Sequence, residues 1–292
     1  MSKSMDDGSK LPPEVEHLHE KMKFALALAS AAAVAGAALY AYINQCPRVS
    51  ELRGAVIILT GASSGIGAEL AVHYGRLGAN LVLAARRREE LEAVASAALT
   101  AGASAALSVP TDMSDPRAVT DLVNVTIERF GRIDILFLNH AIIDDALFVS
   151  HPDAASVDSR LTQIFRANVV GSAMASRLAL PHLERSRGHI AVVSSASAKV
   201  AAPFHSAYVA SKCALHGVFD TLRAELHLLR SNVTIGLQVL GMIGTKEVLQ
   251  DPELAGMAAP VPAVAAEMIC AAQASWDHTY VPKWYWTWTM LV

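Results

Sequence analysis

The sequence is poor in cysteine, with three in 292 residues. Cys46, Cys213 and Cys270 lie far apart, without the spacing of metal ligands and without the density of a disulfide scaffold. We therefore predict no metal site from these residues, and we expect each cysteine to be a small buried hydrophobic residue. Their number does not report the redox compartment.

Neither sign of charge predominates. The chain has 24 Lys and Arg against 27 Asp and Glu, a net charge of −3 at pH 7. This balance lacks the basic footprint of a nucleic-acid-binding protein, so we predict no nucleic-acid partner. A composition of 53% hydrophobic and 17% charged residues is typical of a globular protein with ample material for a core.

Charge is missing altogether from residues 24–43, a stretch about as long as one bilayer-spanning helix. We expect a membrane anchor helix over 24–45, preceded by a disordered polar tail over 1–23. Two alternatives stay open. The high alanine content also suits a buried soluble helix, whereas a cleaved signal peptide would have a shorter leading segment and a shorter apolar region.

Residues 282–292 combine three tryptophans with a terminal apolar stretch. Tryptophan and tyrosine favour the membrane interface, which predicts a tail that contacts the membrane. A tail folded over a substrate cleft and a chain that stops inside a longer segment are the alternatives.

After Leu52, apolar runs alternate with helical patterns, which predicts a parallel sheet covered by helices on both faces. We predict an α/β fold, a single Rossmann-like, doubly wound domain over residues 53–281. The predicted strands are 55–59, 80–85, 104–109, 134–138, 189–194, 233–240 and 278–281, and the last helix is 263–274.

The stretch Thr60-Gly61-Ala62-Ser63-Ser64-Gly65-Ile66-Gly67 joins the first predicted strand to a helix. Gly61 permits the tight turn, Gly65 lets the backbone approach a pyrophosphate, and Gly67 lets the helix pack against the sheet. The N–H groups of the first helical turn then face the anion. This context predicts a dinucleotide-binding turn.

Three arginines, Arg86 to Arg88, follow the second predicted strand, where a dinucleotide fold places the adenosine ribose. With no acidic residue at that strand end, Arg86 favours the 2′-phosphate of NADP(H), and Ser63 and Ser64 can help to bind it. Arg87 and Arg88 are interpreted as a solvated charge run that begins the next helix.

Tyr208 and Lys212 are four residues apart in a helical pattern predicted over 206–229, so they share one face. Ser195 ends a strand that opens toward the ligand crevice of a doubly wound sheet. A free tyrosine, with a pKa near ~10, is a poor base, and a neighbouring ammonium favours its phenolate. These three residues together suit acid/base catalysis on an alcohol or carbonyl.

The glycine turn, Ser195 and Tyr208-x-x-x-Lys212 resemble the short-chain dehydrogenase/reductases over nearly all of residues 53–281. This resemblance implies a nicotinamide cofactor and hydride transfer, with Tyr208 as acid/base, Lys212 holding the ribose and lowering the tyrosine pKa, and Ser195 orienting the substrate. It also implies that Asn168, in a helix expected over 164–180, anchors a water in a proton relay. The catalytic residues implied are Ser195, Tyr208, Lys212 and Asn168; the cofactor-binding residues are Gly61, Ser63, Ser64, Gly65, Ile66, Gly67, Arg86, Asp112, Met113, Asn139, Tyr208, Lys212, Ile243 and Thr245.

Within that family, Leu138-Asn139-His140-Ala141 and Leu240-Gly241 depart from the common pattern. Together with the expected anchor they look like the membrane-anchored 11β-hydroxysteroid dehydrogenase-like branch; we assign His140 no role. This resemblance implies localisation at the endoplasmic reticulum, or on lipid droplets as the alternative. The sequons at Asn124 and Asn232 would matter only for a lumenal domain.

The sequence therefore predicts an NADP(H)-dependent oxidoreductase of a lipophilic, steroid-like hydroxyl or ketone, and the family implies a homodimer. A retinal, fatty-aldehyde or long-chain keto-lipid reductase is the alternative. A membrane or lipid-droplet scaffold that retains the fold is the alternative of another class. We expect specificity to reside in 140–160 and 244–262, which are rich in Ala, Pro and Met.

Overall fold

The computed structural model describes residues 52–144, 146–246 and 248–282. The predicted polar tail 1–23, the predicted anchor 24–45 and all of the predicted C-terminal tail except Pro282 lie outside these residues. Across the described ranges, none of the helices has both the length and the apolar character needed to span a bilayer.

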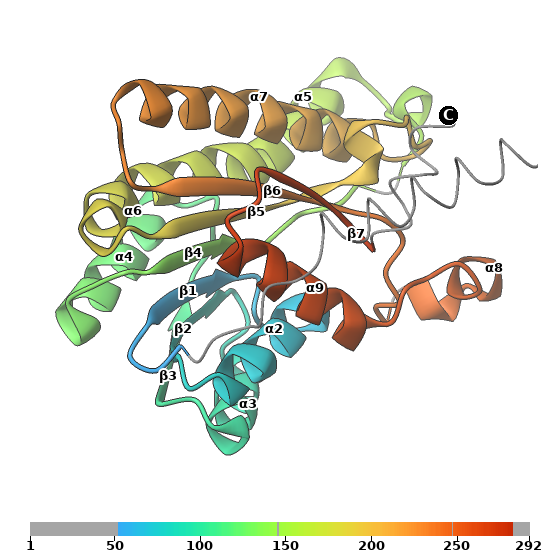
Figure 1. Cartoon of the computed structure of the whole chain (residues 1–292). Helices are drawn as coiled ribbons and strands as arrows, with labels where there is room; N and C mark the ends of the chain where they lie inside the picture. The colour runs from blue at the N-terminus through green and yellow to red at the C-terminus, as the bar shows by residue number, and fades with distance from the viewer. Residues whose placement is uncertain (1–51, 145, 247, 283–292) are drawn as a thin grey trace, which may run out of the picture. The chain divides into compact units, whose positions relative to one another are not determined.

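A parallel seven-stranded sheet forms the centre of the fold, in the order β3-β2-β1-β4-β5-β6-β7 (Figure 1). The chain moves outward from β1 to β3, returns to β4 and continues to β7, which confirms the doubly wound topology. Sequence and structure agree on each strand within about a residue. The strands are β1 (Val56–Thr60), β2 (Asn80–Ala85), β3 (Ala105–Pro110), β4 (Ile135–Leu138), β5 (His189–Ser195), β6 (Thr234–Leu240) and β7 (His278–Val281).

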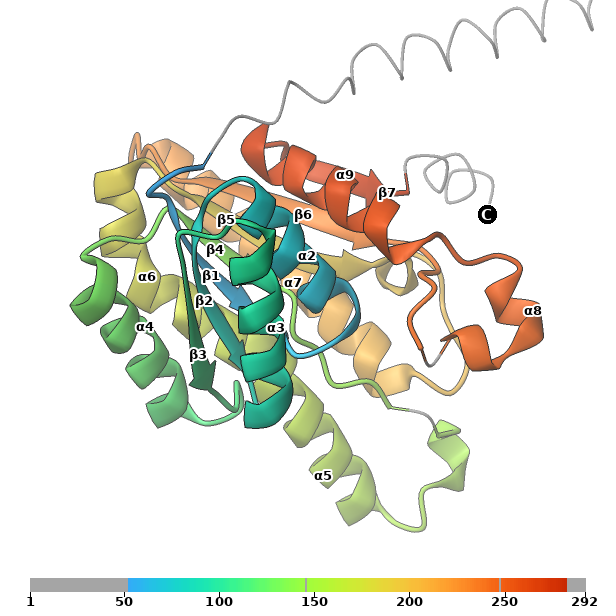
Figure 2. The same ribbon diagram turned by 90° about the horizontal axis from the view of Figure 1, so that it is seen from below.

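The central strands β1, β2, β4 and β5 are largely apolar without alternation, because both faces of the sheet are covered there; the edge strands β3 and β7 are partly exposed. In β1, Ile57 and Leu59 pack into one core cluster, whereas Val56 and Ile58 pack into the other. Helices α2 (Gly65–Arg76), α3 (Arg88–Ala101) and α9 (Val261–Gln273) cover the first face. The opposite face is covered by α4 (Pro116–Phe130), α6 (Ser172–Ser186) and α7 (Ser206–Leu228) (Figure 2).

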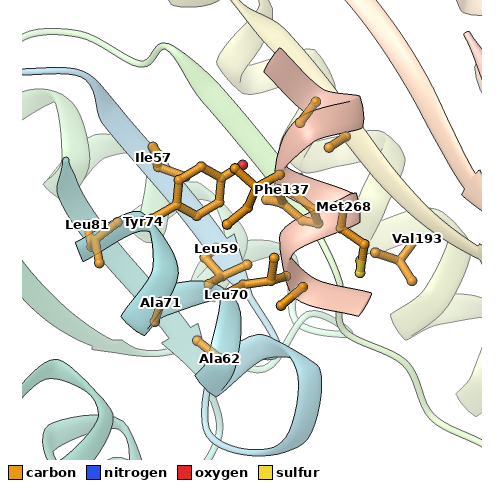
Figure 3. Close-up of a cluster of buried hydrophobic side chains, with 14 of the residues drawn as sticks. Ile57, Leu59, Ala62, Leu70, Ala71, Tyr74, Leu81, Phe137, Val193 and Met268 are labelled. Atoms are coloured by element: carbon orange, nitrogen blue, oxygen red, sulfur yellow. The ribbon is translucent and has the colours of Figure 1, made fainter. Parts of the chain in front are cut away.

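The core beneath α2 and α9 is built around Tyr74 and Phe137 (Figure 3). Their rings meet edge to face with centroids 6.1 Å apart, a favourable arrangement for aromatic pairs. Leu70 of α2 and Met268 of α9 fill the neighbouring space. Burial raises the pKa of the Tyr74 phenol, which therefore stays neutral and acts as core packing.

The prediction of one helix over 164–180 is wrong in one respect, because the helix is not continuous. The region is divided into the end of α5 (Ala154–Phe165), a π-helical segment η2 (Arg166–Gly171) and α6. Gly171 meets the β3 side of the fold so closely that a Cβ there would lie 2.0 Å from the Met113 carbonyl oxygen. A π-helical turn re-aims the side chains within it, and such turns are frequent at functional sites.

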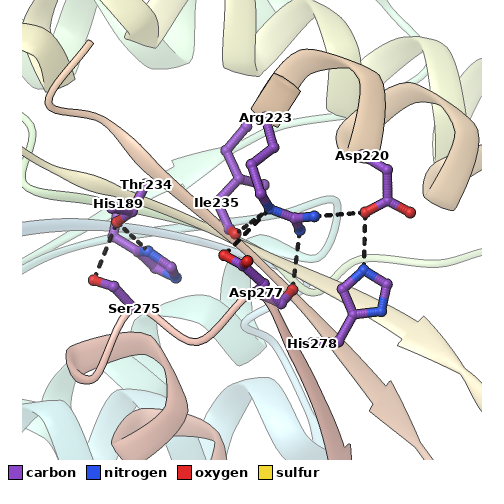
Figure 4. Close-up of polar contacts among 8 residues, drawn as sticks. All are labelled: His189, Asp220, Arg223, Thr234, Ile235, Ser275, Asp277 and His278. Carbon is purple, nitrogen blue, oxygen red and sulfur yellow. Dashed lines mark hydrogen bonds and ion pairs between the residues drawn. The ribbon is translucent and has the colours of Figure 1, made fainter. Parts of the chain in front are cut away.

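The far edge of the sheet is held by a polar network (Figure 4). His189 Nδ1 lies 2.8 Å from the Thr234 hydroxyl, which donates to Ser275 Oγ at 3.1 Å. Arg223 of α7 donates from Nε to the Ile235 carbonyl at 3.0 Å and from Nη2 to the Asp277 carbonyl at 3.0 Å. These bonds fix β5, β6 and the start of β7 to the helix that carries the predicted tyrosine.

The cysteines meet the expectation in part. Cys270 is buried in α9, as predicted. The prediction is wrong for Cys213, which is exposed on α7 and donates from Sγ to the Ala198 carbonyl at 3.4 Å. An amphipathic helix leaves one side uncovered by the sheet, and Cys213 falls on that side. Cys46 lies outside the described residues.

Candidate active site

The glycine turn adopts the geometry that its sequence requires. Gly61 has a φ of +65°, and a Cβ there would lie 2.8 Å from His140 Cα. A Cβ on Gly67 would lie 2.1 Å from the Gly61 carbonyl oxygen, so the first turn of α2 packs directly against the turn. Gly65 has a φ of +54° and its nearest such contact is the Thr245 methyl at 3.6 Å, which leaves room for a ligand at the helix N-terminus.

At the end of β2, Arg87 is the arginine that contacts the glycine turn. Its Nη2 donates to Ser63 Oγ at 3.2 Å and to Ser64 Oγ at 3.1 Å. The Arg87 side chain is also 55% exposed, and its Nε lies 3.4 Å from Glu90 Oε1, as expected for a solvated charge run at the start of α3. Its hydrogen bonds to the two serines are a second set of contacts that the sequence did not indicate. Arg86 lines the same cavity, whereas Arg88 pairs with Glu92 on the exposed surface of α3. Sequence spacing could not separate the three, because neighbouring side chains at a strand end point in different directions.

Asp112, one of the cofactor-binding residues that the family resemblance implies, follows β3. Its Oδ1 accepts hydrogen bonds from the Ser114 N–H at 2.8 Å and the Ser114 hydroxyl at 2.7 Å. Burial acts to raise the pKa of this carboxyl, but the Ser114 hydrogen bonds and the charges of Arg86 and His140 outweigh it and hold the pKa below its usual value. Asp112 is therefore an ionised acceptor at neutral pH.

Asn139 and His140 join the end of β4 to the glycine turn. Asn139 Nδ2 donates to the carbonyl oxygens of Thr60 at 3.3 Å and Gly61 at 3.2 Å. His140 Nδ1 lies 2.8 Å from the Thr60 hydroxyl, and its Nε2 lies 2.9 Å from the Ala167 carbonyl. Because a carbonyl can only accept, the proton belongs on Nε2 and Thr60 donates to Nδ1. Burial lowers the pKa of His140 to about 4, so its imidazole is neutral at pH 7. Its role is structural, because its two ring nitrogens connect Thr60 to Ala167.

These segments surround a cavity of about 450 Å³. It lies at the carboxyl ends of the strands, beside the point where the chain changes direction between β1 and β4, which is the usual ligand position in such sheets. Its walls are Gly61, Ser63, Ser64, Gly65, Ile66, Ala84, Ala85, Arg86, Arg87, Thr111, Asp112, Met113, Asn139, His140, Ala141, Ile142, Ile143, Ala167 and Thr245.

Most of the predicted cofactor-binding residues line this cavity, but Gly67, Ile243, Tyr208 and Lys212 do not. Gly67 serves the packing of α2 described above. Ile243 is buried and pairs by a backbone bridge with Ala259, which supports the loop that carries Thr245. Gly67 and Ile243 therefore do not line the cavity themselves, but they support the segments that do.

The predicted catalytic residues meet where β5 ends beside α7. Ser195 is the last residue of β5, and its Oγ accepts from the Ser197 N–H at 3.2 Å. Lys212 Nζ lies 5.5 Å from the centre of the Tyr208 ring and donates to the Val193 carbonyl at 2.7 Å. The i,i+4 spacing on α7 thus brings both residues to the strand end that carries the serine.

Burial determines the protonation states of Tyr208 and Lys212. It raises the pKa of Tyr208, while a hydrogen bond with Ser195 lowers it. The direction expected from the lysine charge is therefore reversed here, because desolvation penalises the phenolate more than its neighbours favour it. Burial also lowers the pKa of Lys212 to about 8. At neutral pH the tyrosine holds its proton.

Asn168 lies in η2, and its side chain connects the cavity wall to α7. Its Oδ1 accepts from the Ile142 N–H at 2.7 Å. Its Nδ2 donates to the Ile142 carbonyl at 2.9 Å and to Ser211 Oγ at 3.0 Å. Ser211 is in α7, and its Oγ donates to the Tyr208 carbonyl at 2.7 Å, so Asn168 contacts the catalytic helix directly and is linked to the Tyr208 backbone through Ser211.

Asp144 is a site residue that the sequence analysis missed. Its buried carboxylate accepts from the backbone N–H groups of Ala207 and Tyr208, each at 3.0 Å. A carboxylate at a helix N-terminus satisfies free N–H groups and complements the helix dipole. No local sequence pattern indicates this cap, because more than sixty residues separate Asp144 from α7.

The family model described as short chain dehydrogenase matches residues 55–252. A hydroxysteroid 11-beta-dehydrogenase 1-like protein of Gallus gallus is 35% identical over 237 residues, which are 80% of either chain. An 11-beta-hydroxysteroid dehydrogenase A of Arachis hypogaea is 37% identical over 251 residues, covering 80% of this chain and 70% of the relative. The chain therefore belongs to the short-chain dehydrogenase/reductases, in the 11β-hydroxysteroid dehydrogenase-like branch.

Solved structures have the same fold. A short chain dehydrogenase/reductase from Burkholderia phymatum, solved in complex with NAD, matches with a TM-score of 0.72 at 23% identity, over 82% of this chain and 93% of that one. Levodione reductase matches with a TM-score of 0.70 at 25% identity, over 79% and 97%. The predicted family and Rossmann-like sheet are confirmed.

Proposed function

We propose that this oxidoreductase uses NADP(H) to interconvert a hydroxyl and a ketone on a lipophilic, steroid-like substrate. The observation that carries the cofactor choice is the contact of Arg87 with both Ser63 and Ser64. With Arg86 on the same wall, it sets two guanidinium groups and two hydroxyls where a 2′-phosphate would lie. Such donors suit phosphate, and an acidic residue that would favour NAD does not follow β2.

The cavity also fits the rest of a dinucleotide. Gly61 and Gly65 keep the turn free of side chains at the start of α2, and the N-cap residue Ser64 makes no side-chain cap to the helix. The first turn of α2 contains no acidic residue that would repel a pyrophosphate. Asp112 would accept from the adenine amine, and Thr245 would face the nicotinamide carboxamide.

When bound, the nicotinamide supplies a hydride to a carbonyl carbon or accepts one from a carbinol carbon. In the reducing direction, Tyr208 donates its phenolic proton to the substrate oxygen as the C–H bond forms and the C=O π bond becomes an alcohol. Ser195 holds that oxygen by a hydrogen bond. The Lys212 ammonium stabilises the resulting phenolate, and Asn168 positions the wall and α7. Oxidation of the alcohol reverses each transfer.

Large exposed apolar side chains support a lipophilic substrate. Ile143 lines the cavity and is 56% exposed. Ala146 donates its N–H to the Phe204 carbonyl at 3.0 Å, so the segment after the cavity wall lies beside the turn before α7. Further exposed apolar residues lie in or beside the two segments expected to set specificity: Leu147, Phe148, Val149, Phe204, Leu249 and Met257. These residues offer apolar contact and few polar groups.

The test is oxidation of NADPH and NADH by the detergent-solubilised protein against ketosteroids, retinal and fatty aldehydes. We expect a higher kcat/KM with NADPH, and turnover of ketosteroids. Turnover of retinal or fatty aldehydes without turnover of ketosteroids would contradict a steroid-like substrate and support the alternative substrate classes. Absence of NADPH oxidation with every compound would contradict an enzymatic role and favour a scaffold.

We further propose that residues 24–43 anchor the protein in the endoplasmic reticulum membrane, that 282–292 contact it, and that the protein is a homodimer. The charge-free stretch supports the anchor.

The dimer is supported by a stripe of half-buried apolar residues on α7 that suits a subunit interface: Ala210, Ala214, Val218 and Leu222. Carbonate extraction of membranes from cells expressing the full chain and a chain without residues 1–45 tests the anchor, and light scattering in detergent tests the dimer. Release of the full chain by carbonate, or a monomer, would contradict these proposals.

A further inference from the structure

Three possible metal-ligating side chains, His216, Asp220 and His278, lie together away from the cavity. His216 and Asp220 are one helical turn apart on α7, and His278 begins β7. One ligand atom from each lies within 4.8 Å of those of the other two. The sequence did not indicate this group, because 58 residues separate Asp220 from His278.

His216 supplies an observation that is independent of the clustering. The residue is only 8% exposed. Its Nε2 lies 2.8 Å from Ser194 Oγ, which fixes the ring, but its Nδ1 is buried and has no hydrogen-bond partner among the residues that the structure describes. Buried ring nitrogens without a partner are uncommon, and each calls for an explanation. Metal-bound histidines characteristically use one ring nitrogen for the metal and the other for a fixed hydrogen bond.

Asp220 and His278 are placed to complete the group. Asp220 Oδ1 lies 2.8 Å from His278 Nε2 and 2.7 Å from Arg223 Nη1 (Figure 4). Both contacts use Oδ1, which leaves Oδ2 for a cation. The two imidazole rings of His216 and His278 have centroids 5.6 Å apart. The His278 side chain is about one-third exposed, so it can rotate toward a bound ion.

The charge around the group limits which ion can bind. Arg223 opposes any cation, but its Nε also lies 3.5 Å from Asp277 Oδ1, so a second carboxylate offsets the guanidinium. Two imidazoles and one carboxylate do not suit Ca²⁺ or Mg²⁺, which prefer several oxygen ligands. They suit Zn²⁺ and neighbouring transition metals.

We propose that His216 Nδ1, Asp220 and His278 bind one divalent transition-metal ion, with Zn²⁺ as the expected occupant and water in the fourth position. Tetrahedral zinc, with bonds of about 2.0–2.1 Å, needs ligand atoms about 3.3 Å apart. Rotation of the His278 ring would close the remaining distance. The ion would join the edge strand β7 to the helix that bears Tyr208 and Lys212, so its role is structural. The proposal is independent of the substrate and cofactor proposed above.

The experiment uses the full chain in detergent, without a histidine tag and stripped with EDTA. Co²⁺ is titrated while visible absorption is recorded, because tetrahedral Co²⁺ has a characteristic spectrum; Zn²⁺ is then added to displace it. We expect one Co²⁺ per chain and a higher Tm with Zn²⁺ than with EDTA. Wild type that binds less than one equivalent, or whose Tm does not respond to Zn²⁺, would overturn the proposal.

His278→Ala and Asp220→Asn each remove one ligand, and we expect each to weaken Co²⁺ binding at least tenfold. The matched control is His227→Ala, because His227 is an exposed histidine on the same helix outside the group. It should bind Co²⁺ as wild type does. Measuring every variant in EDTA as well separates loss of the ion from loss of the Asp220–His278 hydrogen bond. Equal binding by His278→Ala and His227→Ala would show that the cluster is an ion-pair network only.

Discussion

The carboxylate of Asp144 caps the helix that carries Tyr208. Its Oδ1 accepts from the Tyr208 N–H at 3.0 Å, while Oδ2 accepts from the preceding N–H of Ala207 at 3.0 Å. Asp144 follows the cavity wall formed by Ile142 and Ile143, so one buried side chain joins that wall to the backbone of the acid/base residue.

Replacement of Asp144 by Ala should lower both stability and kcat. Loss of the cap leaves two N–H groups of α7 without their acceptor, at a cost of about 1–2 kcal/mol in the free energy of unfolding. Because Tyr208 is then free to shift, we expect a fall in kcat of about tenfold or more, since small displacements at a catalytic group are costly. Urea unfolding and steady-state kinetics measure the two effects. Asp144→Asn, which keeps one acceptor, should recover part of both, and Asp158→Ala on the exposed face of α5 should match wild type.

Replacement of Tyr208 by Phe should abolish turnover and spare cofactor binding. The phenolic proton is the one transferred to the substrate oxygen, and its removal should cost about 10²–10⁴-fold in kcat. NADPH fluorescence titration and circular dichroism should match wild type, because the ring remains. Turnover retained within tenfold of wild type would exclude Tyr208 as the acid.

Replacement of Arg87 by Ala should impair the use of NADPH selectively. A charge-assisted contact to phosphate contributes about 1.5–3 kcal/mol, so we expect the KM for NADPH to rise about 10–100-fold with little change for NADH. Arg86→Ala should act in the same direction. Arg88→Ala is the control, because Arg88 pairs with Glu92 on the surface of α3. Equal effects on both cofactors would contradict recognition of the 2′-phosphate.

Two glycine substitutions should have opposite effects on stability. A Cβ at Gly67 would lie 2.1 Å from the Gly61 carbonyl oxygen, so Gly67→Ala should destabilise the fold by about 1–3 kcal/mol and weaken cofactor binding. A Cβ at Gly217 would have no atom of the described residues within 4 Å, so Gly217→Ala in α7 should stabilise the fold by about 0.5–1 kcal/mol. Thermal unfolding distinguishes them. A Gly67→Ala protein as stable as wild type would show that the turn can relax.

Acid should destabilise the protein through His189. Burial, aided by the charge of Arg223, lowers the pKa of His189 to about 4, against an ordinary value of 6.5. The unfolded chain therefore binds the proton first, and stability that is complete above pH 6.5 is lost as the pH falls toward 4. The His189→Gln protein has no titrating group at this position. Between pH 7 and 4 we therefore expect its free energy of unfolding to fall by about 3 kcal/mol less than that of wild type. Urea unfolding across this range tests it, and parallel pH curves would contradict it.

Much of the fold follows from the order of residues alone. The apolar runs of the central strands β1, β2, β4 and β5 are continuous because both faces of a parallel sheet are buried, so their periodicity distinguishes strands from the amphipathic helices between them. The glycine turn and the Tyr208–Lys212 pair are local patterns, fixed by backbone geometry and helical spacing. These features could therefore be predicted, and the sheet topology confirms the fold they indicate.

The tertiary structure decided what depends on contacts between distant segments. Arg87, and not Arg86, reaches the serines of the turn, because the direction of a side chain at a strand end depends on the packing around it. Asn168 occupies a π-helical turn beside the close approach of Gly171 to Met113, and Asp144 caps a helix far along the chain. The sequence determined the elements and the motifs within them. Only three-dimensional packing, which brings together groups with no local signal of their proximity, selected the side chains that complete the site.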